Sequence, residues 1–103
     1  MIFKRPYRHI SVKQAMEIMA QQDHIIVDVR SKEEYEEKHI PDAICIPLDT
    51  MDKPILLQDK KQTILVYCLT GRRARKAARK LAKLGYENVY EFGGIAFWPG
   101  ETV

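Results

Sequence analysis

The sequence predicts an α/β domain: a central, mostly parallel sheet of about five strands with helices on both faces. Short apolar runs rich in β-branched residues alternate along the chain with segments whose apolar residues recur at helical spacing. Strands separated by helices connect through right-handed crossovers, which join parallel strands. The 103 residues have the usual length of one domain, so we expect a single domain over residues 1–103.

The first half of the chain alternates helix and strand signals. Ser11 and Ser31 each stand three residues before a Gln or Glu, which is the pattern of a capping box, and each predicts a helix directly after it. The β-branched run 25–29 has the length of a buried strand and is too short for a helix. The apolar segment 43–46 lies between two prolines and predicts another short strand. A weaker helix is expected over residues 51–58.

The second half predicts a strand, a helix and a final strand. The apolar run 63–67 predicts the first of these strands, and residues 88–92 predict the last. Residues 71–84 have helical spacing, and Gly85 stands where a glycine commonly ends a helix. The apolar face expected for this helix consists of Ala74, Ala77, Ala78, Leu81 and Leu84.

Composition excludes several classes of protein. No apolar run approaches the roughly 18–20 residues of a membrane span. Two cysteines are too few for a disulfide scaffold or a metal cage, and the three histidines lack the spacing of metal ligands. We therefore expect a cytoplasmic protein that uses neither a metal nor a cofactor and does not act at a membrane.

The net charge of +3 conceals a strong local asymmetry. Residues 71–84 contain no acid and seven cations, namely Arg72, Arg73, Arg75, Lys76, Arg79, Lys80 and Lys83. The rest of the chain holds 10 basic and 14 acidic residues. Such a cluster suggests that an anion binds close by. The anion could belong to a small substrate, an acidic partner protein or a nucleic acid. A solvated helix face is the alternative.

The candidate nucleophile is Cys68, at the junction of a predicted strand and a predicted helix. Ligands of parallel sheets bind at the carboxyl ends of the strands. The backbone N–H groups of Leu69 through Arg73 can form a nest around a negative atom, and the helix N-terminus adds partial positive charge. These effects favour the thiolate, the nucleophilic form of cysteine. An inert core thiol is the alternative interpretation.

The residues after Cys68 support the first interpretation. Arg72 and Arg73 oppose the macrodipole at a helix N-terminus, where a purely structural sequence would place Asp or Glu. Two arginines there are explained if an anion occupies the loop. Gly71 permits the positive φ that a tight loop requires. The candidate substrate-binding residues are therefore Leu69, Thr70, Gly71, Arg72 and Arg73.

With these motifs the sequence resembles the rhodanese-like (sulfurtransferase) family in its single-domain form. The loop 68–73 looks like the active-site loop of that family, C-x-x-G-x-R. Residues 26–30, 35–47 and 84–98 look like three further family motifs, in the order that the family has them. The resemblance covers most of the chain and implies a rhodanese-like domain of three layers, a parallel sheet between helices.

The resemblance also implies a reaction. Cys68 would attack the sulfane sulfur of a small anionic donor such as thiosulfate, expel sulfite and become a persulfide, and a thiol or protein acceptor would then remove the sulfur. Arg73, the last residue of the motif, would bind the anionic end of the donor, and Arg72 would assist from the rim. The physiological donor and acceptor and the oligomeric state stay open.

Several residues outside the loop qualify this interpretation. Asp42 stands where the family usually has Gly, and Ala74 stands where many members have Ser. Asp28 and Arg30 are expected to support the site, either as an ion pair or by closing a helix cap. Cys45 is expected to be a core thiol rather than a resolving cysteine, and a disulfide between Cys45 and Cys68 stays open.

Two other functions fit parts of the sequence. The first is a cysteine phosphatase or arsenate reductase. Those enzymes have five residues between Cys and Arg, whereas four separate Cys68 from Arg73, and the shorter ring of N–H donors suits a single sulfur better than a tetrahedral oxyanion.

The second is a non-catalytic or carrier module that docks a partner protein or RNA through the basic helix, although no nucleic-acid motif is present. Five cations are expected to lie beyond reach of a small substrate: Arg75, Lys76, Arg79, Lys80 and Lys83.

Overall fold

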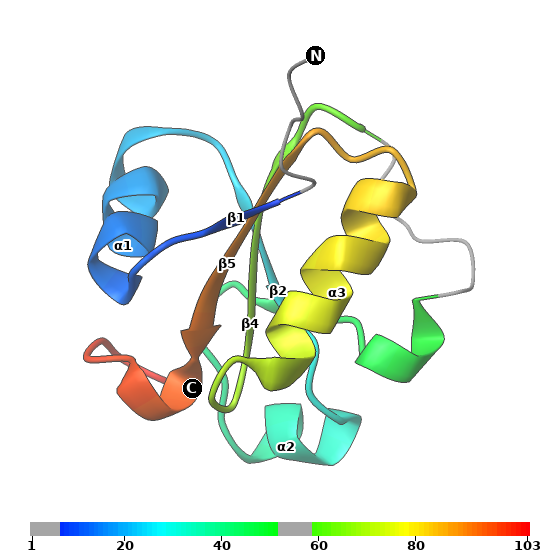
Figure 1. Ribbon diagram of the computed structural model, residues 1–103. Helices are drawn as coiled ribbons and strands as arrows, with labels where there is room; N and C mark the ends of the chain where they lie inside the picture. Colours follow the sequence, from blue (N-terminus) through cyan, green and yellow to red (C-terminus); the bar gives the residue numbers. More distant parts are fainter. Residues whose placement is uncertain (1–6, 52–58) are drawn as a thin grey trace.

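The centre of the protein is a five-stranded sheet in which all neighbouring strands are parallel (Figure 1). The computed structural model describes residues 7–51 and 59–103. The strands lie in the order β1-β5-β4-β2-β3 and comprise β1 Arg8–His9, β2 Ile25–Asp28, β3 Ile44–Cys45, β4 Thr63–Cys68 and β5 Asn88–Gly94. The helices are α1 Val12–Gln21, α2 Lys32–Glu37 and α3 Arg72–Lys83, with the short 3-10 helices η1 Leu48–Thr50 and η2 Ile95–Phe97. The predicted α/β fold is confirmed.

The sheet separates two hydrophobic clusters, and α1 and α3 cover opposite faces (Figure 1). The cluster under α3 includes Val27, Val66, Cys68, Ala77 and Leu81. The cluster on the other face includes Ala15 of α1, Leu65, Tyr67, Phe92 and Ile95. Because successive side chains of a strand point to opposite faces, Tyr67 faces the α1 side and Cys68 faces α3. The loop after β4, helix α2 and helix η2 gather at one end of the sheet (Figure 1).

Both predicted capping boxes are present. The Ser11 hydroxyl accepts a hydrogen bond from the Gln14 amide at 3.0 Å, and the Ser11 amide donates to Gln14 Oε1 at 2.9 Å. Ser31 and Glu34 exchange the same two bonds at 3.2 and 3.0 Å. These reciprocal bonds satisfy N–H groups that the first turns of α1 and α2 leave unpaired, and so both helices begin where the sequence predicts.

Helix α3 buries the predicted face except at its end. Ala74, Ala77, Ala78 and Leu81 are fully buried, whereas Leu84 is 45% exposed, so its assignment to the buried face was wrong. The reason is that the helix stops at Lys83. Gly85 has φ 100°, its amide donates to the Ala82 carbonyl, and the Tyr86 amide donates to the Leu81 carbonyl. This Schellman motif turns the chain away before Leu84 can reach the core.

Strand β1 was not among the predicted strands. It has two exposed residues, too few for an alternating pattern, and its pairing with Tyr90 and Glu91 of β5 depends on a partner distant in the sequence. The helix expected over residues 51–58 falls outside the described residues except at Met51, which is buried. Within the described part of the chain, no helix has the length and apolarity to cross a membrane.

Candidate active site

Cys68 is the last residue of β4 and lies at the N-terminus of α3. Its Sγ accepts hydrogen bonds from the backbone N–H of Gly71 at 3.0 Å and of Ala74 at 3.3 Å. The residue is 1% exposed, so these donors act on the sulfur largely shielded from water. Of the predicted donors 69–73, Gly71 does bond to the sulfur, and Ala74 lies one residue beyond that segment. The arrangement places a sulfur atom at the positive end of a helix.

The loop requires glycine at Gly71. Its φ is 126°, a conformation that residues with a Cβ rarely adopt, in agreement with the expectation from sequence. A Cβ there would lie 3.0 Å from Nη1 of Arg75 and 3.3 Å from Cα of Gly93. The loop therefore packs between the Arg75 guanidinium and the end of β5, and a larger residue would move the amide that bonds to Cys68.

The end of β5 supports the loop from the other side. A Cβ on Gly94 would lie 1.9 Å from the Leu69 carbonyl oxygen, so only glycine allows the two backbones to approach this closely. The Ala96 amide donates to the same oxygen at 3.0 Å. Leu69 and Thr70 are exposed, so their side chains stand at the surface of the loop. The sequence does not predict this support, for which the glycine pair at 93–94 is the only signal.

Arg73 is paired with an acidic residue of α2. Its guanidinium donates two hydrogen bonds to the Glu34 carboxylate, at 2.6 and 3.0 Å. This pairing is the main cause that lowers the pKa of Glu34 to about 2, and it likewise raises the pKa of Arg73. Because Glu34 also caps α2, the pair fastens the first turn of α3 to α2. The sequence signalled Glu34 only as a capping residue.

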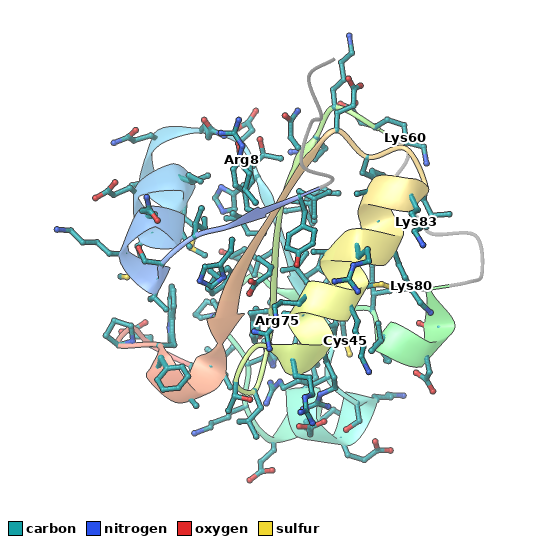
Figure 2. The ribbon with its side chains drawn as sticks, in the orientation of Figure 1. Arg8, Cys45, Lys60, Arg75, Lys80 and Lys83 are labelled. Carbon is teal, nitrogen blue, oxygen red and sulfur yellow. The ribbon has the colours of Figure 1, made fainter. Side chains whose placement is uncertain are left out.

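Arg75 lies closer to the loop than the sequence suggested. Its guanidinium folds back against Gly71, where an added Cβ would lie 3.0 Å from Nη1, and the expectation that it stands beyond reach of a small substrate stays untested. Figure 2 shows this side chain beside the loop that joins β4 to α3, whereas Lys80 and Lys83 lie farther along the helix. Arg72 is exposed at the start of α3, as predicted for a residue on the rim.

Asp28 and Arg30 form a buried ion pair, and Arg30 also bonds to the carbonyl of Lys38, the C-cap residue of α2. Arg30 Nη2 lies 2.7 Å from Asp28 Oδ2, and the same nitrogen donates to the Lys38 carbonyl at 2.6 Å. The two residues are 0% and 3% exposed. Burial lowers the pKa of Arg30, but the hydrogen bond and charge of Asp28 outweigh it and the pKa is raised. The pair holds the end of β2 against the segment that follows α2.

The two departures from the family pattern differ in their surroundings. Asp42 has φ 69°, a left-handed conformation that glycine adopts freely and that Asp tolerates better than most residues. Ala74 is fully buried, and its amide is one of the donors to Cys68. The backbone contribution of this position is thus retained, and the hydroxyl of a serine is absent.

Cys45 belongs to a different environment. Both cysteines are free, and Cys45 pairs in register with Asp28, which pairs on its other side with Tyr67. Strand β2 lies between β3 and β4, so two strand spacings of about 4.8 Å each separate the two cysteine-bearing strands. Their sum exceeds the roughly 7 Å between Cα atoms that a disulfide spans, so Cys45 and Cys68 do not pair. Burial, followed by the charge of Asp28, raises the pKa of Cys45. The residue is half-buried, less enclosed than a core thiol.

Comparison with known proteins agrees with this geometry. The family model of the rhodanese-like domain matches residues 11–100. This chain belongs to the rhodanese-like family. The thiosulfate sulfurtransferase GlpE of Coxiella burnetii is 33% identical over 93 residues, which are 89% of this chain and 87% of the relative. The putative sulfur carrier protein YrkF of Bacillus subtilis is 38% identical over 78 residues, 75% of this chain and 42% of that protein.

A solved structure shows the same fold. A rhodanese from E. coli, described with anions, superposes with a TM-score of 0.72 at 34% identity and covers 78% of this chain and 96% of its own. Family membership together with the names of the relatives supports a sulfurtransferase, which is an enzyme. The names of these relatives, a sulfurtransferase and a sulfur carrier, also imply that this chain uses a sulfur donor and a sulfur acceptor.

Proposed function

We propose that this protein transfers a sulfane sulfur from an anionic donor such as thiosulfate to a thiol acceptor through a persulfide on Cys68. The observation that carries this proposal is the position of Cys68 Sγ at the N-terminus of α3, within hydrogen-bond distance of two amide N–H groups. Negative charge on that sulfur is stabilised without a general base. The relative from Coxiella burnetii named a thiosulfate sulfurtransferase supports the choice of donor.

The first half-reaction loads the enzyme. The Cys68 thiolate attacks the outer sulfur of thiosulfate, a new S–S bond forms, and the bond between the two sulfurs of thiosulfate breaks. Sulfite leaves with the electron pair of that bond, and Cys68 becomes a persulfide. In the second half-reaction a thiolate acceptor attacks the outer sulfur of the persulfide, and Cys68 leaves as the thiolate. Neither step needs an oxidant, a reductant or a metal.

Three arginines at the start of α3 supply positive charge for the donor. Arg73 would bind the sulfonate end as the resemblance implies, and it does so while it shares its guanidinium with Glu34. Arg72 is exposed at the rim, and Arg75 lies against Gly71. We therefore add Arg75 to the predicted donor-binding residues. Positive charge next to the loop favours a dianionic donor over a neutral one.

Replacement of the nucleophile tests the proposal. Cys68→Ser should lower thiosulfate-dependent sulfur transfer to cyanide by at least about a thousandfold, because a hydroxyl does not form the persulfide. Mass spectrometry after thiosulfate treatment should show one added sulfur at Cys68 in the parent protein. Cys45→Ser is the matched control and should keep both properties. Full activity of Cys68→Ser, or a sulfur added only at Cys45, would overturn the proposal.

The location proposed from sequence is the cytoplasm. Its support is the presence of two free cysteines that the fold holds too far apart to pair with each other.

A further inference from the structure

A cavity of about 520 Å³ lies beside the active-site loop, against one side of α3. Its apolar part is formed by Val29, Pro47 and Leu48, which follow β2 and β3, and its basic wall by Arg73, Lys76 and Lys80 of α3. Asp49 stands among the lining residues as their acidic member. We name this feature the α3 groove.

The α3 groove starts at the first turn of α3, close to the active-site loop, and Cys68 itself does not line it. Arg73, at one end, immediately precedes Ala74, whose amide donates to Cys68 Sγ. Val29 packs in the same hydrophobic cluster as Cys68. From Arg73 the groove follows two turns of α3 to Lys80, a distance of about 10 Å at 1.5 Å per residue. A molecule in the groove would therefore have one end next to the loop that carries the sulfur.

The size of the groove does not match the small donor. Thiosulfate has five non-hydrogen atoms, whereas cavities of about 300–1,000 Å³ hold ligands of drug size. The apolar side chains of Val29, Pro47 and Leu48 offer a sulfonate no hydrogen bonds. A short stretch of polypeptide, which has both apolar and charged side chains, uses such a surface better than an inorganic anion does.

The positive charge of the neighbouring helix favours a negatively charged polypeptide. Arg72, Lys76, Arg79 and Lys83 recur at helical spacing, so they form one exposed stripe along α3 next to the groove. No acidic residue occurs in α3. Arg73 shares its guanidinium with Glu34, whereas Lys76 is an exposed cation on the groove wall one turn farther along α3.

We propose that the α3 groove binds an acidic, cysteine-bearing segment of the protein that accepts sulfur from Cys68. This inference rests on the proposed function and names the class of its acceptor. The segment places its acidic side chains against Lys76 and the basic stripe, and its apolar side chains against Pro47 and Leu48. Its cysteine thiolate then attacks the outer sulfur of the persulfide, the S–S bond to Cys68 breaks, and Cys68 leaves as the thiolate.

Direct binding tests the groove without any sulfur chemistry. Three fluorescent peptides of equal length are compared, and each carries a serine in place of the reactive cysteine and a neighbouring leucine. They differ in the remaining flanking residues, which are glutamates in the first peptide, glutamines in the second and lysines in the third. The glutamate peptide should bind at least about fivefold more tightly than the glutamine peptide at low salt, and about 0.5 M salt should remove the difference. Equal binding of the two, or tighter binding of an oligonucleotide of the same charge, would overturn the inference.

Charge-reversal variants locate the binding surface. Lys76→Glu should abolish the preference for the glutamate peptide. Lys13→Glu, an exposed position on α1 across the sheet, makes the same change in net charge and should keep the preference. Arg79→Glu changes an exposed residue of α3 outside the lining of the groove and should weaken the preference less than Lys76→Glu does. Equal effects of all three variants would indicate a general field and contradict docking in the groove.

Sulfur transfer then links docking to the reaction. Persulfide-loaded protein is mixed with the cysteine forms of the same peptides, and the ratio of the rates for glutamate and glutamine peptides is measured by mass spectrometry. The ratio should be about five in the parent protein and about one in Lys76→Glu. If the serine peptides bind as expected and no persulfide forms on Cys68, the docking inference stands and the proposed function fails. A ratio of one in the parent protein would overturn the inference.

Discussion

Two cysteines stand at the carboxyl ends of parallel strands in the same sheet, yet their surroundings differ in every respect that matters for reactivity. Cys68 continues into a glycine loop and a helix N-terminus, and two amide N–H groups bond to its sulfur. Cys45 continues into Ile46 and Pro47, and its sulfur contacts the Arg30 carbonyl oxygen at 3.7 Å. One sulfur faces donors and the other faces an acceptor, so only the first is placed to hold negative charge.

The comparison teaches that the end of a strand does not make a thiol reactive by itself. Both residues have the same position in the α/β architecture, and a search for cysteines at strand ends would select both. The amides of the following turn distinguish them, because they point inward only where Gly71 allows the chain to turn with positive φ. Variants that remove this difference should remove the activity.

The largest effect is expected from a change to the loop that leaves Cys68 in place. Gly71→Ala should lower thiosulfate sulfurtransferase activity by about a hundredfold, because the amide of residue 71 must move to relieve the strain of a Cβ at φ 126°. Gly85→Ala is the matched control: its φ is 100°, and nothing lies within 4 Å of the added Cβ. It should cost about 1 kcal/mol of stability and keep activity. Similar activities of the two variants would contradict the role of the loop amides.

A smaller effect is expected from the charge next to the loop. Arg75→Gln should lower kcat/KM for thiosulfate by about fivefold, because one cation near the donor is removed without a change of backbone. Arg79→Gln removes the same charge farther along α3 and should change kcat/KM by less than twofold, roughly the screened contribution of a distant surface charge. The assay is sulfur transfer to cyanide at several donor concentrations. A larger loss in Arg79→Gln would contradict the assignment of Arg75.

The Glu34–Arg73 pair predicts a pH-dependent contribution to stability. The pKa of Glu34 is lowered from 4.5 to about 2, so its contribution is present above pH 4.5 and is lost as pH falls towards 2. Glu34→Gln should therefore reduce the free energy of unfolding at pH 7 by about 1–2 kcal/mol, after allowance for partial exposure of the pair. Near pH 2 the two proteins should be equally stable. Glu37→Gln, an exposed residue of the same helix, serves as the control in urea unfolding, and a constant difference at all pH values would contradict the prediction.

The smallest effect concerns Cys45 itself. In the Cys68→Ser background, alkylation of Cys45 by iodoacetamide should remain slow at pH 8 and increase above pH 9, because burial and Asp28 raise its pKa above the ordinary 9.0. The sign follows from the thiolate being the reacting form, whose fraction grows as pH rises through the pKa. Mass spectrometry of the labelled peptide gives the rate. A rate that is already maximal at pH 8 would show that the two cysteines differ less than the structure indicates.

Local features of the sequence predicted most of the fold. The capping boxes at Ser11 and Ser31 and the glycine that ends α3 act through hydrogen bonds within a few residues, and all three are present. Strand β1 could not be predicted in the same way. Its two exposed residues contain no pattern, and they form a strand only because β5 offers unpaired backbone groups beside them.

The features of the candidate site likewise fall into those that the sequence predicts locally and those that depend on contacts between distant segments. By itself the sequence determined that Cys68 precedes a glycine loop and a basic helix, because those features are contiguous along the chain. Only the tertiary structure decided how the cations are used: Arg73 is paired with a residue 39 positions away, and Arg75 lies on Gly71. It also decided that Lys76 and Lys80 face an apolar groove. Pairings between distant segments follow from how the strands are ordered in the sheet, which no local pattern of residues records.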